Sequence, residues 1–156
     1  MKNKKIKNVL IALDYNPTAQ KIAELGFAFA NAMQAKITLS TIYENYTNYT
    51  PVIYDPIMGF PGFTETDAIS QELIIADTRK FLEKTKKHLG DDNIAIMLKE
   101  GHSADGVLTI AHEIRADLIV MGSHSKKWLD KLLIGSTTEK VLRHTEIPML
   151  IIPTKG

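Results

Sequence analysis

The stretch that decides the fold runs from Val120 to Pro153 and reads VMGSHSKKWLDKLLIGSTTEKVLRHTEIPMLIIP. It begins inside a short apolar run, residues 118–121, whose length and β-branched content predict a buried strand that Gly122 ends. A polar and basic turn follows at residues 123–127. The stretch closes with a second apolar run, residues 147–152, which predicts another strand.

A helix is predicted between these two strands, opening at Gly135, Ser136 and Thr137. Ser136 and Glu139 stand three residues apart, which is the spacing of a capping box, so Ser136 or its neighbour is expected to start the helix. Free N–H groups and the helix dipole favour a phosphate at such a start, and glycine lets the backbone approach a ligand closely. An ordinary capped helix after a turn fits the same residues equally well.

Outside this stretch, the chain alternates short apolar runs with segments of helical period. Asn16-Pro17 is interpreted as an N-cap followed by proline at the first helical position, and Gly26 is expected to pack closely on the sheet. This alternation predicts an α/β fold with a mostly parallel, doubly wound sheet and right-handed crossovers. The other expected strands are 6–13, 36–44 and 93–99, and the strand at 118–121 is expected to start at Asp117. The other expected helices follow Asn16-Pro17, span Asp67–Leu89 and follow an N-cap at Ser103.

The chain of 156 residues is expected to form a single domain, 1–156. Its unusual part is 45–66, a long insertion rich in aromatic residues and proline. A segment of this length is either functional or a linker, and its aromatic content argues against plain disorder. Local packing, a dimer contact and a lid over a ligand are the alternatives that the residues leave open.

Composition excludes several classes of function. The net charge of +1 gives no global signal for nucleic acid or an anionic membrane. The absence of cysteine excludes disulfides and thiolate metal sites and agrees with a cytoplasmic location. The apolar run Val9–Leu13 is too short for a signal peptide or a membrane span. The five histidines lack paired metal-ligand spacing, so neither a metal site nor a catalytic constellation is expected.

The spacing of Gly122, Gly135 and Ser136 resembles the C-terminal signature of the universal stress protein family. In nucleotide-binding members that signature is Gly, two residues, Gly, nine residues, Gly, then Ser or Thr. Ser125 stands where the second glycine belongs, and Gly135 and Ser136 follow nine residues later. The opening run Asn8–Asp14, NVLIALD, also resembles the family, so the resemblance spans nearly the whole chain.

The resemblance implies a three-layer α/β/α fold like that of the adenine nucleotide alpha hydrolases, with strand order 3-2-1-4-5. The first and fourth strands then flank the topological switch point, where open α/β sheets bind ligands. Asp14 ends the first strand and Gly122 ends the fourth, so both are expected at one crevice.

By the same resemblance, the crevice would hold ATP or a related adenine nucleotide, with Mg²⁺ as a possible companion of the phosphates. Ser125 in place of glycine is expected to weaken phosphate binding without abolishing it. His124 could donate to a phosphate, although an exposed turn histidine is an equal alternative. The implied binding residues are Ala12, Leu13, Asp14 and Ile42 around the base, Met121 and Gly122 beside the ribose, and Ser123, His124, Ser125, Gly135, Ser136 and Thr137 around the phosphates.

Three functions remain open from the sequence. The first is a stress-response regulator that binds ATP. The second is a dimeric interaction module that binds no nucleotide, and the third is a very slow ATPase. A homodimer is expected through the last strand, because an apolar strand at a sheet edge invites pairing. The protein partners beyond a second copy cannot be inferred from these residues.

Overall fold

The computed structural model describes residues 3–44, 66–123 and 134–154, with residues 66–70 described by their backbone alone. Within these ranges the chain forms a five-stranded sheet of order β3-β2-β1-β4-β5, and every neighbouring pair is parallel. The predicted doubly wound sheet and its strand order are thus confirmed. The strands are β1 (Asn8–Ala12), β2 (Lys36–Tyr43), β3 (Ala95–Glu100), β4 (Leu118–Gly122) and β5 (Met149–Ile152).

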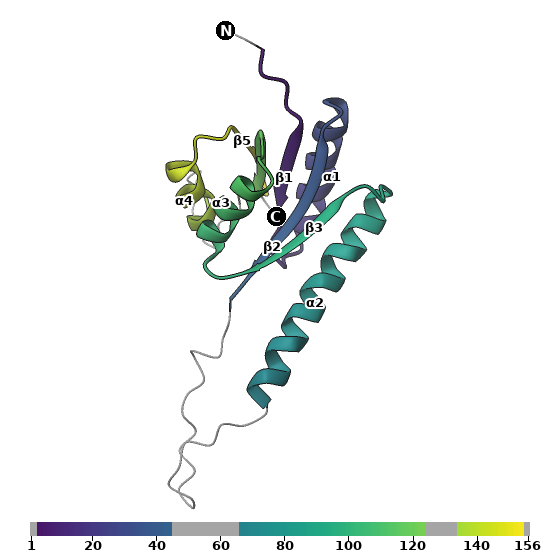
Figure 1. Ribbon diagram of the computed structural model, residues 1–156, viewed down its shortest axis with the longest axis vertical. Coiled ribbons are helices and arrows are strands. Elements are labelled where there is room, and N and C mark those ends of the chain that lie inside the picture. Colours follow the sequence, from purple (N-terminus) through teal and green to yellow (C-terminus); the bar gives the residue numbers. More distant parts are fainter. Residues whose placement is uncertain (1–2, 45–65, 124–133, 155–156) are drawn as a thin grey trace, which may run out of the picture.

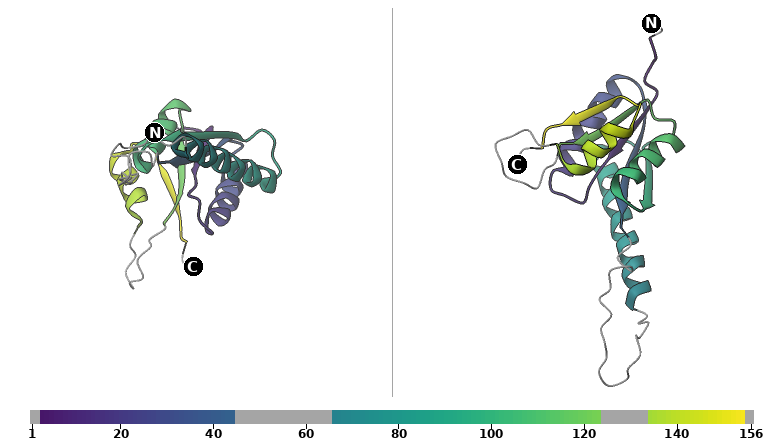
Figure 2. Two further views of the ribbon diagram at one scale, coloured as in Figure 1. Left: turned by 90° about the horizontal axis from the view of Figure 1, so that it is seen from below. Right: turned by 90° about the vertical axis from the view of Figure 1, so that its left-hand side faces the viewer.

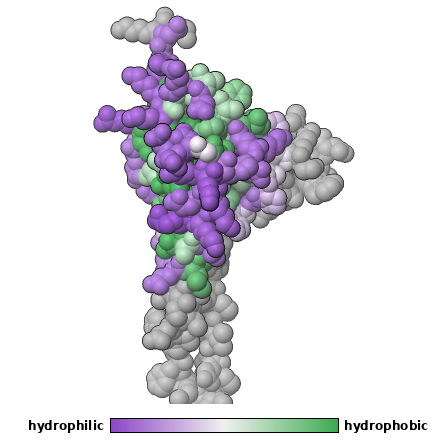
Figure 3. All heavy atoms as spheres, turned by 90° about the vertical axis from the view of Figure 1, so that its right-hand side faces the viewer, coloured by the Kyte–Doolittle hydropathy of each residue, from purple (hydrophilic) through white to green (hydrophobic). Residues whose placement is uncertain are grey.

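Helices cover both faces of this sheet and give the expected three layers. Figure 1 shows α3 and α4 on one side of the sheet and α1 and α2 on the other, and Figure 2 shows the same layers from two further directions. On the side of α1 and α2, the outer surface carries mostly hydrophilic side chains with smaller hydrophobic areas among them (Figure 3). The helices are α1 (Ala19–Ala32), α2 (Thr66–Leu89), α3 (Ser103–Glu113) and α4 (Ser136–His144).

The central strand β1 shows why the sheet must be covered twice. Its residues Val9, Leu10 and Ile11 are fully buried, as expected for a parallel strand with helices on both faces. Val9 and Ile11 join the apolar cluster beneath α1 and α2, whereas Leu10 joins the cluster beneath α3 and α4. Because side chains alternate between the two faces of the sheet, residues of this one strand pack into two separate cores.

The prediction that Gly26 packs closely on the sheet is confirmed. A Cβ atom at this position of α1 would lie 2.9 Å from Cδ1 of Ile11 and 3.2 Å from Cγ1 of Val120. Any larger residue would push α1 away from β1 and β4. Gly90 is confirmed as the stop of α2, where its φ of +72° suits glycine.

The expected start of α1 was wrong by two residues. The helix begins at Ala19 with Thr18 as its N-cap, not at Asn16-Pro17. Oδ1 of Asn16 instead accepts hydrogen bonds from the backbone N–H and the hydroxyl of Thr18, at 3.0 and 3.1 Å. Asparagine favours such local turns as readily as caps, so Asn16 organises a turn before the helix.

Two other caps also differ from expectation. Ser103 is the first residue of α3 and His102 is its N-cap, while α4 starts at Ser136 as predicted but is capped by Gly135. The capping box does not form, because Gly135 is the N-cap and has no side chain; the carboxylate of Glu139 accepts from the guanidinium of Arg143 at 2.7 Å. β5 begins at Met149, two residues later than predicted, because Pro148 has no N–H to donate to a neighbouring strand.

One expectation concerns residues that the structure describes only in part. The insertion 45–66 lies outside the described residues except for Thr66, the first residue of α2. Its packing, dimer-contact and lid interpretations therefore stay predictions. Among the helices that the structure describes, none combines the length and the apolar character needed to cross a membrane.

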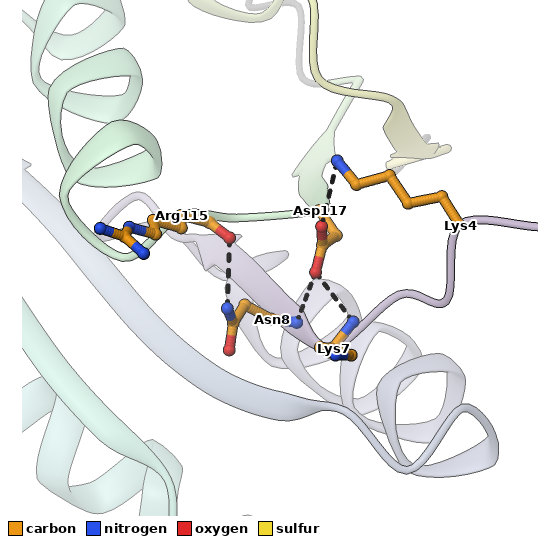
Figure 4. Close-up of polar contacts among 5 residues, drawn as sticks. All are labelled: Lys4, Lys7, Asn8, Arg115 and Asp117. Carbon is orange, nitrogen blue, oxygen red and sulfur yellow. Dashed lines mark hydrogen bonds and ion pairs between the residues drawn. The ribbon is translucent and has the colours of Figure 1, made fainter.

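Asp117 ties the beginnings of β1 and β4 together (Figure 4). Its Oδ2 accepts from the backbone N–H of Lys7 at 2.9 Å and of Asn8 at 3.1 Å, and its Oδ1 lies 3.3 Å from Nζ of Lys4. The side chain of Asn8 donates to the carbonyl of Arg115 at 3.2 Å. These contacts fix the register of the two central strands at the end of the sheet opposite the carboxyl ends of the strands.

The pKa of the Asp117 carboxyl is lowered from its ordinary value of 3.8, first by the hydrogen bond from the Lys7 N–H and then by those from Asn8 and Lys4, against the opposing effect of burial. The pKa of Asp117 is lower in the folded state than in the unfolded state, so the carboxylate stabilises the fold at pH values above its ordinary pKa. That contribution is lost as the pH falls through the folded-state pKa. The side chain of Lys4 is 82% exposed, so its ion pair with Asp117 contributes little to the stability of the fold.

We predict that Asp117→Asn lowers the free energy of unfolding by about 1 kcal/mol at pH 7, since one charge-assisted acceptor is replaced by a neutral amide. Urea denaturation should show this loss at pH 7 and a progressively smaller loss as the pH falls below the ordinary value of 3.8 and through the lower folded-state pKa, where the wild-type carboxyl also takes up a proton. The matched control is Asp92→Asn, at an exposed position, which should change stability little at either pH. A loss of equal size at both pH values would contradict the account.

Candidate functional site

A cavity of about 660 Å³ opens where β1 and β4 end, at the switch point of the sheet. This volume lies within the range of small-molecule sites in proteins. Both central strands contribute their last residues, and three helix starts complete the wall. The described residues that line it are Ala12, Asp14, Tyr15, Asn16, Thr18, Ala19, Ile22, Ser103, Met121, Gly122, Ile134, Gly135, Ser136, Thr137, Thr138 and Glu139.

Residues 134–139, at the start of α4, form one part of this wall. Its N-cap Gly135 has extended backbone angles and no side chain, so no side-chain cap engages the first turn. The first four N–H groups of a helix have no partner within it, and the dipole makes that end positive. The first turn of α4 is therefore suited to bind an anionic group placed in the cavity.

Close packing at Gly122 holds the start of α4 beside the end of β4. A Cβ atom on Gly122 would overlap Cδ1 of Ile22 and would lie 3.0 Å from Cγ2 of Thr154. The hydroxyl of Thr138, which is buried, donates to the Gly122 carbonyl at 2.8 Å. A glycine is thus required here for the approach of three segments, and not only for the flexibility of a turn.

Ser123 joins the end of β4 to the segment that follows β5. Its N–H donates to the carbonyl of Ile152 at 2.9 Å, and its Oγ accepts from the N–H of Thr154 at 3.1 Å. Lys21 of α1 donates to the carbonyl of Pro153 at 2.7 Å. Ser123 therefore lies behind the cavity wall, where it positions Gly122 and its neighbours instead of lining the space itself.

The structure brings together seven of the twelve residues that the sequence analysis assigned to the site. Leu13 is buried and its N–H donates to the carbonyl of Ser40 at 2.8 Å. Ile42 lies under α3, where its side chain fills the space that a Cβ atom on Gly106 would need. His124 and Ser125 lie outside the described residues, as do Lys126 and Lys127. The seven in the cavity wall are Ala12, Asp14, Met121, Gly122, Gly135, Ser136 and Thr137.

Sequence reasoning missed the other helix starts. Tyr15, Asn16 and Thr18 come from the turn before α1, and Ser103 is the first residue of α3. The signal that could have found them is topological, because every helix that follows a parallel strand begins at the same edge of the sheet. None of the three helix starts around this cavity carries a side-chain cap in the described chain.

The charges around the cavity are divided between its parts. The start of α4 is positive by its dipole, whereas Asp14, at the end of β1, brings a carboxylate. Glu139 also lines the wall, but its carboxylate is engaged with Arg143 at 2.7 Å. Among the described residues, no group of three or more His, Asp or Glu side chains is gathered as a metal site.

A parallel, doubly wound sheet with a ligand-sized cavity at its switch point places the protein in the class of open α/β folds. Residues 5–153 match the model of the Universal stress protein family. The chain therefore belongs to the universal stress protein family, and the resemblance inferred from the glycine pattern is confirmed.

Two archaeal relatives illustrate the match. The chain is 28% identical over 148 residues to the universal stress protein MJ0531 of Methanocaldococcus jannaschii, covering 94% of this chain and 81% of that protein. It is 24% identical over 156 residues to MJ0577 of the same organism, with 96% of each protein covered. The solved structure of MJ0577 superposes with a TM-score of 0.74 over 98% of this chain and 99% of that one.

Two solved neighbours contain a nucleotide. One is a universal stress protein in complex with cAMP, with a TM-score of 0.68 and 20% identity over 97% of this chain and 100% of that one. The other, from Archaeoglobus fulgidus, is in complex with dAMP, with a TM-score of 0.61 and 14% identity over 96% of this chain and 99% of that one. At this level of identity, the comparison establishes a shared fold.

Proposed function

We propose that this universal stress protein binds an adenine nucleotide, ATP or a related one, in the cavity at the ends of β1 and β4. Through that binding it would act as a stress-response regulator. The observation that carries the proposal is the uncapped start of α4 facing a cavity of about 660 Å³. The complexes of two structural neighbours with cAMP and dAMP support the choice of an adenine nucleotide.

Charge decides how the nucleotide lies in the cavity. Phosphates belong at the start of α4, where the N–H groups of Ser136 and Thr137 and the helix dipole favour an anion. Asp14 would repel a phosphate, but its carboxylate accepts hydrogen bonds from ribose hydroxyls or an adenine amino group. The nucleoside therefore lies toward β1, and Mg²⁺, where present, accompanies the phosphates at the other side.

We predict that Asp14→Ala weakens ATP binding by about 1–3 kcal/mol, the range for losing a hydrogen bond to a charged group. Isothermal titration calorimetry with Mg-ATP measures the change directly. The control is Asp92→Ala, which removes an exposed carboxylate that does not line the cavity and should leave the affinity unchanged. Unchanged affinity in a folded Asp14→Ala variant would remove Asp14 from the site.

A thermal-shift series tests the proposal against the two other functions. Binding of a ligand to the folded state alone raises the melting temperature with ligand concentration. Mg-ATP, cAMP and dAMP should each be tried at millimolar concentration. No shift with any of them would favour the dimeric interaction module, whereas steady phosphate release during long incubation with ATP would favour the slow ATPase.

We further propose that the protein is a homodimer through β5. This strand lies at the edge of the sheet, and its residues Met149, Leu150 and Ile151 are all partly exposed in the single chain. A partner strand related by a two-fold axis would cover this apolar edge and close the assembly. Pro148 limits the pairing at one end of the strand.

We predict that Ile151→Lys converts the dimer to a monomer, because a charged side chain would be buried between the two edge strands. Multi-angle light scattering at micromolar concentration gives the mass. Thr109→Lys, at an exposed position of α3, is the matched control and should remain dimeric. A monomeric mass for the wild type would contradict the proposed dimer.

A further inference from the structure

Tyr15 is the one aromatic residue among the described residues that line the cavity. It follows Asp14 directly, and 77% of its surface is exposed, the largest fraction among the exposed large hydrophobic residues of the described chain. A large ring left open to solvent at the rim of a ligand-sized cavity provides a free apolar surface. Neither the packing of α1 nor the sheet requires a tyrosine at this position.

The ring of Tyr15 is nevertheless held in place. It makes an edge contact with Phe81 of α2, with ring centroids 5.1 Å apart and an interplanar angle of 63°. Phe81 is itself partly buried against the apolar cluster beneath α1 and α2. Such T-shaped pairs are a favourable aromatic geometry, and this one orients the ring while most of its surface stays accessible.

Tyr15 and the start of α4 lie on opposite sides of the end of β1. Phe81 belongs to α2, which packs on β2 and β3, whereas Thr138 of α4 is hydrogen-bonded to Gly122 at the end of β4. The sheet order β3-β2-β1-β4-β5 places β1 between these two groups. The cavity at the carboxyl edge is lined both by Tyr15 and by the start of α4, although α2 and α4 cover opposite faces of the sheet (Figure 1). A nucleotide whose phosphates sit at α4 would reach Tyr15 by extending its base past Asp14 and across this edge.

We propose that Tyr15 forms the stacking platform for the base of the bound nucleotide and so determines how tightly the base end is held. This inference rests on the proposed nucleotide site. Aromatic side chains stack on any base through its π-face, so the ring contributes affinity for the base without reading its hydrogen-bonding edge. Tyr15 would stack on the base, and the start of α4 would bind the phosphates.

The test compares two probes, Mg-ATP and inorganic tripolyphosphate with Mg²⁺, by isothermal titration calorimetry. Tyr15→Ala is expected to weaken ATP binding by about 5- to 100-fold, the range for losing one aromatic–base stack. Tripolyphosphate has no base, so its affinity should change less than twofold. Tyr15→Phe keeps the ring and should bind ATP within about threefold of the wild type.

Phe29→Ala is the matched control, because Phe29 is an aromatic residue of α1 that is 51% exposed and does not line the cavity. It should bind both probes as the wild type does. The exposure of Tyr15 makes misfolding of its variants unexpected, and circular dichroism checks this. Photolabelling with 8-azido-ATP gives a second readout in the wild type and should modify the tryptic peptide that contains Tyr15.

Four outcomes would overturn the inference. ATP affinity within twofold of the wild type in Tyr15→Ala would exclude a stacking role. An equal loss for ATP and tripolyphosphate would mean that the substitution disturbs the whole cavity. If Asp14→Ala weakens ATP binding and Tyr15→Ala does not, the stacking platform fails while the nucleotide site stands. A wild type that binds no ATP at millimolar concentration would overturn both.

Discussion

The approach of three segments at Gly122 is the constraint on which the site depends. The end of β4, the side chain of Ile22 from α1 and Thr154 after β5 meet where even a methyl group would not fit. The hydroxyl of Thr138 then fastens the first turn of α4 to the carbonyl of Gly122. The start of α4 is consequently held by the core of the protein, so its N–H groups are oriented before any ligand arrives. Preorganisation of this kind lowers the cost of binding, because little has to be ordered when the ligand enters.

The topology explains why the rest of the cavity forms around that point. In a parallel sheet, every following helix starts at the carboxyl edge, and the reversal of strand order between β1 and β4 opens a space there. Three helix starts, those of α1, α3 and α4, reach this space. The opposite edge of the sheet is closed by Asp117, which fixes the starts of β1 and β4. The starts of the two central strands are thus held together by hydrogen bonds that stabilise the fold, and their ends form part of the candidate site.

The architecture was predictable from the sequence because the apolar residues of each strand and helix recur with a regular period and because glycine or proline marks where these elements end. Apolar runs, helical stripes and terminating glycines such as Gly90 indicated each strand and helix, and the glycine spacing around Gly122 indicated the family. The caps were not predictable, because Asn16 and Glu139 each have a local alternative to capping that only the folded neighbours select. The contribution of Tyr15 to the cavity wall depends on the order of the strands and the placement of Phe81, which are properties of tertiary structure. The packing of the Ile42 side chain against Gly106 of α3 likewise depends on tertiary structure.

The most direct test of the central claim, that the cavity between β1 and β4 holds an adenine nucleotide, is a titration of the ¹⁵N-labelled protein with Mg-ATP followed by amide NMR. The account predicts that the largest shift changes occur at the carboxyl edge, at Asp14, Tyr15 and Gly122 and at residues 135–138 of the α4 start. The amides of Lys7 and Asn8, at the opposite end of the sheet, should hardly move. Changes confined to that opposite end or to the lysine-rich start of the chain, or no changes at millimolar ATP, would contradict the account.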